Sequence, residues 1–192
     1  MIEWLKTIDE QLLIAINRHH STACDHLMWF ASGDKSWLGL YAFLLLLLII
    51  QFKKQSWWLI VLIIPLIAVS DQLASSVLKP WVMRLRPSHE PALQNMLHYV
   101  NNYRGGTYGF VSSHSFNVFS IASYLSLTAM AKIKWIPWVL FPWALFVSCS
   151  RVYLGVHYPL DVLVPMILGI LNGIGFAMIY HRFKPNFYTS KS

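Results

Sequence analysis

The chain has 192 residues, of which 56% are hydrophobic and only 12% are charged. A soluble domain has roughly 45–50% apolar and about 25% charged residues, so this composition excludes an ordinary soluble globule. Uncharged runs alternate with short segments that carry nearly all of the charge, which indicates a membrane protein with several crossings. The net charge of +7 suits loops that contact anionic lipids, or a site for an anionic substrate, better than it suits nucleic acid.

The length allows one membrane-embedded domain, residues 1–192, with five or six transmembrane helices, because each crossing needs about 20 residues. We expect an all-α integral membrane bundle whose spans cover residues 36–52, 57–78, 112–131, 135–150 and 159–180. Residues 1–35 are mixed in polarity, with a turn near residues 19–21 and four apolar residues at helical spacing, Ile8, Leu12, Leu13 and Ile16. This pattern is typical of an amphipathic segment that lies in the membrane interface.

The basic residues predict the orientation of the spans. The loops at 53–54 and 132–134 and the C-terminal tail fall on one face and carry seven Lys or Arg residues, which makes this face cytoplasmic by the positive-inside rule. The other face carries eight, but five of them lie in segments that we assign to a site: Lys79, Arg84, Arg86, Arg104 and Arg151. We therefore expect a bacterial inner-membrane protein whose site faces the periplasm or exterior.

Three cations on the outer face predict an anion site. The polar stretch 79–111 is expected to be an outer loop region that carries site residues, among them Lys79 and Arg86, and Arg151 ends the fourth span. Uncompensated charges are costly at the edge of a membrane, so the three cations should share an anion. Phosphate suits two guanidinium groups and one ammonium.

Two histidines add chemistry to this anion site. Ser112, Ser113 and His114 open the third span, where the free N–H groups of a helix start attract an anion. His157 and Asp161 are four residues apart, which on a helix places them on one face. An aspartate that accepts from one ring nitrogen leaves the other nitrogen free to attack. We therefore expect metal-free hydrolysis of a phosphate ester through a phosphohistidine at His157, with His114 as the proton donor.

These residues also match a known pattern. The chain resembles the type 2 phosphatidic acid phosphatase superfamily of lipid phosphate phosphatases, whose first motif is Lys, six residues and Arg-Pro, matched by Lys79 and Arg86-Pro87. The third motif is Ser-Arg, five residues, His, three residues and Asp, matched by Ser150-Arg151, His157 and Asp161. The second motif, Pro-Ser-Gly-His, appears as Val111-Ser112-Ser113-His114, so that Val and Ser replace Pro and Gly.

The resemblance implies a role for each matched residue. His157 would attack phosphorus, Asp161 would support it, and His114 would protonate the leaving oxygen. The phosphate would be held by five residues: Lys79, Arg86, Ser112, Ser113 and Arg151. It further implies a helical bundle with the site at the outer membrane surface, no metal or other cofactor, and a lipid phosphate and the bilayer as partners. The sequence carries no signal for an oligomeric state.

The substrate is expected to be a lipid phosphate or diphosphate whose chains stay in the bilayer. Undecaprenyl diphosphate is favoured, solely because this activity is frequent in the family. Phosphatidylglycerol phosphate, phosphatidic acid and lipid A phosphates fit the same description. A different class of protein, which binds or transports phospholipids without cleaving them, would not need the two histidines and Asp161.

Several other polar residues receive more modest expectations. Arg84 is expected at the periphery of the substrate, and the glycine-rich stretch 104–109 is expected to be a flexible rim. Five further histidines do not have the spacing of a metal-ligand set, and none is expected to bind a metal: His19, His20, His26, His89 and His98.

Overall fold

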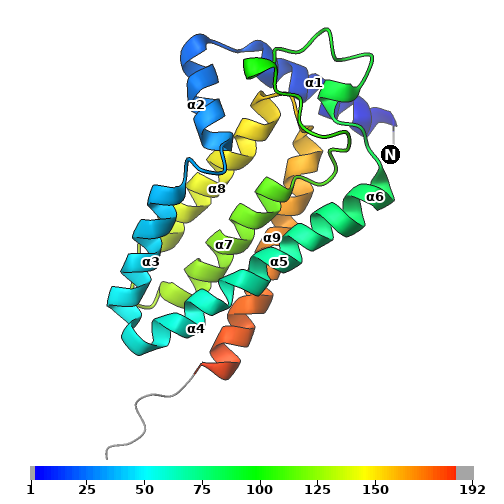
Figure 1. Ribbon diagram of the computed structural model, residues 1–192. Helices are drawn as coiled ribbons and strands as arrows, with labels where there is room; N and C mark the ends of the chain where they lie inside the picture. The colour runs from blue at the N-terminus through cyan, green and yellow to red at the C-terminus, as the bar shows by residue number, and fades with distance from the viewer. Residues whose placement is uncertain (1–2, 185–192) are drawn as a thin grey trace, which may run out of the picture.

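The computed structural model describes residues 3–184, which form helices joined by loops and contain no β-strand (Figure 1). Its α-helices are α1 (Glu3–Arg18), α2 (Thr22–Ser32), α3 (Leu38–Phe52), α4 (Ser56–Val61), α5 (Ile63–Gln72), α6 (Lys79–Val82), α7 (Ser113–Ala129), α8 (Ile136–Tyr153) and α9 (Pro159–Phe183). A π-helical segment (Leu73–Leu78) joins α5 to α6, and short 3-10 turns cover Lys53–Gln55, Pro87–His89 and Val100–Asn102. The all-α prediction is confirmed.

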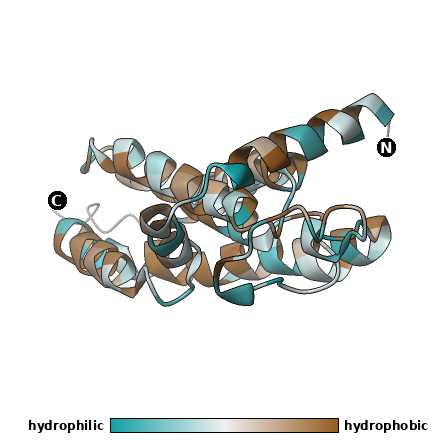
Figure 2. Cartoon of the chain, turned by 90° about the horizontal axis from the view of Figure 1, so that it is seen from above, coloured by the Kyte–Doolittle hydropathy of each residue, from teal (hydrophilic) through white to brown (hydrophobic). Residues whose placement is uncertain are grey.

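Three helical stretches within residues 3–184 are long and apolar enough to cross a membrane: Leu38–Val82, Ile136–Tyr153 and Pro159–Phe183. The first of them reverses direction at the Lys53–Gln55 turn, so it runs along the bundle twice (Figure 1). Seen from above, hydrophobic residues dominate the bundle helices, and hydrophilic residues gather in the connecting loops (Figure 2). The chain is therefore a helical membrane protein.

Helix α7 forms the centre of the bundle and packs against α5, α8 and α9. It is not among the three apolar stretches, since it is only 17 residues long and five of its buried residues are serine or threonine: Ser115, Ser120, Ser123, Ser126 and Thr128. A helix that is surrounded by other helices needs no lipid-facing apolar surface, and its hydroxyl groups can hydrogen-bond across helices. The Asn172 amide of α9, for example, donates to Ser120 Oγ and to the Leu66 carbonyl of α5, both at 3.1 Å.

Small residues bring α7 and α9 into close contact. Gly169 and Gly173 lie one turn apart on α9 and face α7, where an added Cβ would lie 2.7 Å from the Phe116 carbonyl oxygen or 2.6 Å from Ser123 Cβ. Glycines at this spacing let two helical backbones approach within a membrane. The contact matters for function because α7 begins beside His114 and α9 begins beside His157.

The ends of two spans differ from the prediction. The second span does not end at Leu78, since helical structure continues to Val82 and places Lys79 on a helix instead of in a loop. The fourth span extends to Tyr153 and includes Arg151. Polar residues can remain helical here because they lie at the end of the bundle, where their side chains find polar partners.

The predicted basic loops lie at one end of the bundle. Lys132 Nζ donates to the Gln51 carbonyl at 2.8 Å, which ties the 132–134 loop to the turn after α3. His181, near the end of α9, lies 3.3 Å from the Leu127 carbonyl near the end of α7. The basic residues of all three segments are therefore neighbours, although Lys191 lies outside the described residues.

The N-terminal segment folds as two helices joined at residues 19–21, where the sequence predicts the turn. Helix α1 lies across the other end of the bundle (Figure 1). It leaves one row of apolar side chains exposed, Trp4, Ile8, Leu12 and Ile16, as an interfacial helix requires. The adjacent row buries Asp9, Leu13 and Asn17, so α1 is also an integral part of the domain.

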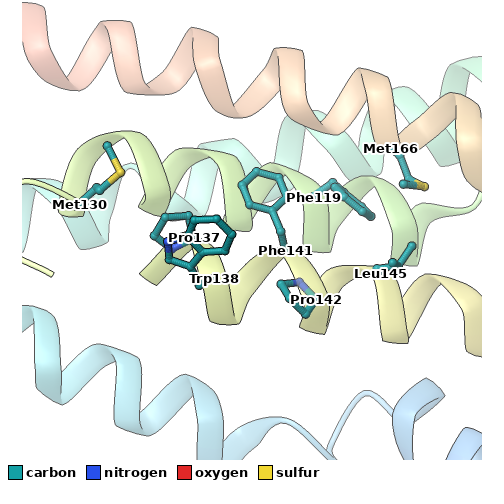
Figure 3. Close-up of a pocket in the computed structure, with 8 residues that line it drawn as sticks. All are labelled: Phe119, Met130, Pro137, Trp138, Phe141, Pro142, Leu145 and Met166. Carbon is teal, nitrogen blue, oxygen red and sulfur yellow. The ribbon is translucent and has the colours of Figure 1, made fainter. Parts of the chain in front are cut away.

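A cavity of about 630 Å³ lies between α7, α8 and α9 and is lined by apolar residues (Figure 3). The Trp138 side chain at its edge is 81% exposed, so lipid chains can fill this cavity from the membrane side. None of the predicted site residues lines it, and the chemistry must be sought at the polar end of the bundle.

The helix contact generates a matched pair of stability predictions. Gly173→Ala should destabilise the protein by about 1–3 kcal/mol, because the methyl group cannot fit against Ser123 without moving α7. Gly175→Ala should be neutral or stabilising by up to about 1 kcal/mol, since no atom lies within 4 Å of its added Cβ and alanine favours a helix. Melting temperatures of the purified variants in detergent test the pair, and equal values would contradict the packing.

Candidate active site

The three predicted clusters meet at the end of the bundle that α1 covers. The Ser112 N–H at the start of α7 donates to the Asp161 carbonyl of α9 at 2.8 Å. The Arg86 guanidinium, which follows α6, donates from Nε to the Tyr108 carbonyl at 3.1 Å and from Nη1 to the Val156 carbonyl at 3.4 Å. Segments that are distant in the sequence are therefore joined directly by hydrogen bonds around one site.

His157 forms the floor of this site and is only 2% exposed. Its Nε2 lies 3.2 Å from Arg86 Nη1. A guanidinium can only donate, so Nε2 accepts and the ring proton is assigned to Nδ1. The lone pair of Nε2 consequently points toward the cations, where an anion would lie.

Burial lowers the pKa of the His157 imidazole well below its ordinary value, and the positive charges of Arg86 and Arg151 lower it further. The ring is therefore neutral at neutral pH. A neutral imidazole keeps the lone pair that nucleophilic attack requires.

His157 does not lie on a helix, contrary to the prediction. Pro159 is the first residue of α9 and forces the preceding Tyr158 into an extended conformation, so the helix begins after His157. Asp161 Oδ2 nevertheless lies 3.7 Å from His157 Nδ1. This distance is too long for a hydrogen bond, and His157 Nδ1 has no hydrogen-bond partner among residues 3–184.

The carboxylate of Asp161 is held instead by Arg84 and by the helix start. Its Oδ1 accepts from Arg84 Nη1 at 2.9 Å, and its Oδ2 accepts from the Tyr158 N–H at 3.1 Å. Arg84 also pairs with Asp9 of α1 at 2.7 Å, and Asp9 accepts from the Leu160 N–H at 2.8 Å. Arg84, expected at the periphery of the substrate, thus lies between two carboxylates in the structure, with a side chain that is 12% exposed.

Lys79 and Arg151 approach the site from opposite sides. Lys79 Nζ donates to Ser113 Oγ at 2.8 Å, a contact that the glycine of the family motif could not make. Arg151 donates from Nη1 to Ser32 Oγ of α2 and from Nη2 to the Tyr103 hydroxyl, the latter at 3.3 Å. Its Nε is buried without a partner among the described residues. Among residues 3–184, both cations thus have only neutral hydrogen-bond partners.

His114 opens into a small cavity of about 180 Å³ that it shares with Arg151 and Tyr103. Its Nε2 lies 3.0 Å from Asp34 Oδ1, a contact that sequence reasoning missed because Asp34 lies 80 residues away in the α2–α3 connection. A second cavity of about 490 Å³ lies on the other side of the cations, beside Lys79 and Arg86.

The glycine-rich stretch is not a free rim but packs against the site. An added Cβ on Gly109 would lie 2.9 Å from Asp161 Oδ2, and one on Gly105 would lie 2.8 Å from Arg86 Nη1. Gly105 also has a φ of +68°, which strains other residues. Glycine is required here so that the backbone can lie directly on Arg86 and Asp161.

Comparisons with known proteins agree with this arrangement. A family model described as the PAP2 superfamily matches residues 57–187. The lipid A 4'-phosphatase of Bacteroides thetaiotaomicron is 37% identical over 184 residues, which cover 95% of this chain and 81% of that protein. The lipid A 4'-phosphatase of Porphyromonas gingivalis is 29% identical over 173 residues, which cover 90% and 72%.

One solved structure has the same fold. The crystal structure of the first transmembrane PAP2 type phosphatidylglycerolphosphate phosphatase from Bacillus subtilis aligns with a TM-score of 0.72. The alignment covers 95% of this chain and 89% of that chain at 22% identity. The membrane bundle described above is therefore shared with a protein of known structure.

The buried Arg84 network generates a second pair of predictions. Asp9→Asn should lower stability by about 1–3 kcal/mol, because it removes a charged partner of a buried guanidinium. Glu10→Gln, the next residue on α1, should cost less than about 1 kcal/mol, since Glu10 pairs with Lys6 at 3.8 Å on the surface. Melting temperatures of both variants in the same detergent test this prediction. Small losses of stability in both variants would contradict a structural role for Asp9.

Proposed function

The chain belongs to the PAP2 superfamily and is a lipid phosphatase, and we propose that it removes the 4'-phosphate of lipid A through a phosphohistidine at His157. One observation supports this mechanism above all. Lys79, Arg86 and Arg151 have no carboxylate within ion-pair distance among residues 3–184, whereas Arg84 next to them has two. Three unpaired cations around a neutral imidazole favour a phosphate group as the missing partner.

In the proposed first step, the three cations and the N–H groups at the start of α7 hold the phosphate oxygens. The Nε2 lone pair of His157 then forms a bond to phosphorus, and the bond from phosphorus to the lipid oxygen breaks. His114 donates a proton to that oxygen as it leaves. The negative charge of the bound phosphate favours the protonated form of His114 beforehand.

In the second step, water attacks the phosphohistidine. His114, now neutral, accepts a proton from this water, and the bond between phosphorus and Nε2 breaks. Inorganic phosphate leaves, and both histidines return to their starting states. The cations stabilise the five-coordinate arrangement in both steps, so no metal ion is needed to neutralise the phosphoryl group.

Asp161 supports the nucleophile in this proposal without touching the substrate. When His157 binds phosphorus its ring becomes positively charged, and the proton on Nδ1 faces Asp161 Oδ2. A small rotation would turn the 3.7 Å contact into a charge-assisted hydrogen bond, as often happens only in the reacting complex. Arg84 and the Tyr158 N–H fix the carboxylate for this purpose.

The relatives favour lipid A over the undecaprenyl diphosphate expected from the sequence. Two lipid A 4'-phosphatases match at least nine-tenths of this chain, whereas the earlier expectation rested on family frequency alone. The 490 Å³ cavity beside Lys79 and Arg86 has room for a sugar ring next to the phosphate. The apolar row on α1 and the basic loops at the far end support an active site at the periplasmic face of the inner membrane.

A panel of phosphorylated lipids tests the substrate. Purified protein should release phosphate fastest from lipid A that carries a 4'-phosphate, and more slowly from phosphatidic acid, phosphatidylglycerol phosphate and undecaprenyl diphosphate. Activity should persist in the presence of a metal chelator, because the cations of the protein neutralise the phosphate. Faster release from undecaprenyl diphosphate would refute lipid A as the substrate. A requirement for added metal would refute the metal-free mechanism.

Substitution of the nucleophile tests the mechanism. His157→Ala should reduce kcat by at least about 10⁴-fold, since no other group lies in position to attack phosphorus. His181→Ala is the matched control, because this exposed histidine lies at the opposite end of the bundle, and its kcat should be that of the wild type. Substantial turnover by a folded His157→Ala protein would exclude the phosphohistidine.

A further inference from the structure

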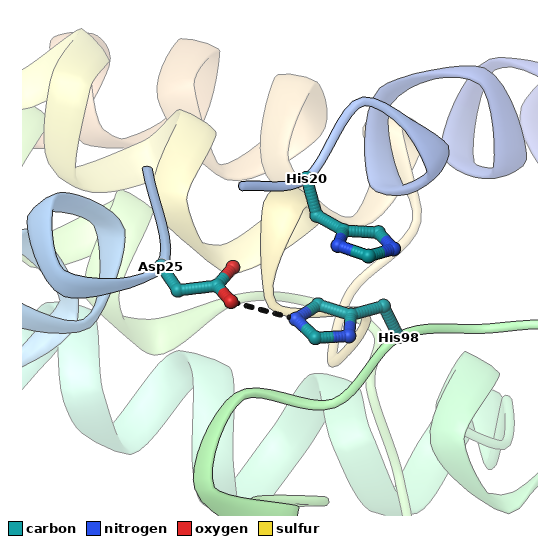
Figure 4. A group of neighbouring side chains, drawn as sticks. All are labelled: His20, Asp25 and His98. Atoms are coloured by element: carbon teal, nitrogen blue, oxygen red, sulfur yellow. Dashed lines mark hydrogen bonds and ion pairs between the residues drawn. The ribbon is translucent and has the colours of Figure 1, made fainter. Parts of the chain in front are cut away.

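A second cluster of polar side chains lies on the outer end of the protein, apart from the residues assigned to phosphate. It consists of His20 in the α1–α2 turn, Asp25 on α2 and His98 in the long loop before α7 (Figure 4). The two imidazole rings are stacked, with centroids 3.8 Å apart and planes 10° apart. His98 Nε2 lies 2.9 Å from Asp25 Oδ2.

We propose that His20, Asp25 and His98 form a binding site for a divalent transition-metal ion such as Zn²⁺. One potential ligand atom from each side chain lies within 4.8 Å of the other two. Ligands bound at about 2.0–2.2 Å from one zinc ion lie at most about 4.4 Å apart. Side-chain rotations that take the two rings out of their stacked arrangement would turn the lone pairs toward one another and close the three atoms around an ion, with water in a fourth position.

The three groups have the chemical character that this ion requires. Two imidazoles and one carboxylate favour Zn²⁺ over Mg²⁺ or Ca²⁺, which prefer sites made of oxygen atoms alone. The two rings lie side by side, so that one nitrogen atom of each can be brought to the same ion. A bound metal ion would lie between one nitrogen atom of each ring and the Asp25 carboxylate, and it would supply the positive charge that this carboxylate needs.

Asp25 is already held in the form and orientation of a ligand. Burial raises its pKa, but hydrogen bonds from Tyr153 and His98 outweigh this effect, so the pKa lies below its ordinary value and the carboxylate is ionised. The Tyr153 hydroxyl donates to Asp25 Oδ1 at 2.7 Å and leaves Oδ2 toward the histidines. Such an outer hydrogen bond to a ligating carboxylate is typical of metal sites.

The position of the cluster indicates what a bound metal would do. It would join the α1–α2 turn to helix α2 and the long loop, and the latter two reach the candidate active site: α2 carries Ser32 and the loop carries Tyr103, both hydrogen-bonded to Arg151. Asn17 already links the backbone of His98 to the Tyr153 carbonyl, with donors and acceptors at 2.7–2.9 Å. The ion would hold the outer rim of the site together while taking no part in phosphate cleavage.

Calorimetric titration of the purified, chelator-treated full chain with ZnCl₂ tests the proposal. The wild type should bind one Zn²⁺ per chain and melt at a higher temperature with Zn²⁺ than without it. His20→Ala and His98→Ala should each weaken binding by at least about tenfold, and Tyr153→Phe, which removes the hydrogen bond to Asp25 and the one from the Ser21 N–H, should weaken it by about tenfold. His26→Ala and His89→Ala are matched controls and should bind as the wild type does.

A second readout covers the case in which a variant folds poorly. Co²⁺ bound at the site should give visible absorption bands that His20→Ala abolishes, and this side chain is exposed on a turn, so the fold should tolerate its loss. Absence of saturable Zn²⁺ binding by the wild type, or binding of equal strength by His20→Ala and His98→Ala, would overturn the proposal. Neither Zn²⁺ binding nor the Co²⁺ absorption depends on hydrolysis, so failure of the metal site would leave the proposed function unaffected.

Discussion

The structure depends on a separation of charge at the outer end of the bundle. Four cations gather there, but the two nearest buried carboxylates, Asp9 and Asp161, both pair with Arg84. The remaining cations, Lys79, Arg86 and Arg151, keep only neutral hydrogen-bond partners among residues 3–184. Unpaired charges in such a place are destabilising on their own, and in the proposed mechanism the phosphate of the substrate would compensate them. Arg84 thus serves the site indirectly, because it pairs with the carboxylates that would otherwise neutralise the other three cations.

The helix contacts explain how so many distant residues can be held at one point. Close packing of α7 on α9 at Gly169 and Gly173 fixes the two helix starts, which carry His114 and Asp161. Helix α1 then covers this end, with Asp9 hydrogen-bonded to the first turn of α9. The N-terminal segment therefore has two roles, because its exposed apolar row suits the membrane interface while its buried polar face completes the charge network. A change in α1 should reach the catalytic groups through Arg84.

Much of the fold and most of the site residues could be predicted from the sequence, because hydrophobic runs mark spans and fixed spacings mark motifs. The start of α9 at Pro159 and the turn at 53–55 both follow from local chemistry. What the sequence could not show are contacts between residues far apart in the chain. Arg84 with Asp9, His114 with Asp34, and His20 with His98 are each separated by more than 70 residues, and none of these pairs has a characteristic spacing. The glycine-rich loop was misjudged for a related reason: flexibility can be inferred from composition, but close packing against Arg86 and Asp161 depends on the tertiary fold.

The central claim, a covalent bond between phosphorus and His157 Nε2, can be measured directly. Protein mixed with a substrate carrying a radiolabelled phosphate and quenched within one turnover should contain label that is stable in alkali and lost in acid, as a phosphohistidine is. Mass spectrometry of the digested protein should place the phosphate on His157. Label at a different residue, or complete turnover with inversion of configuration at phosphorus and no labelled protein, would contradict the account.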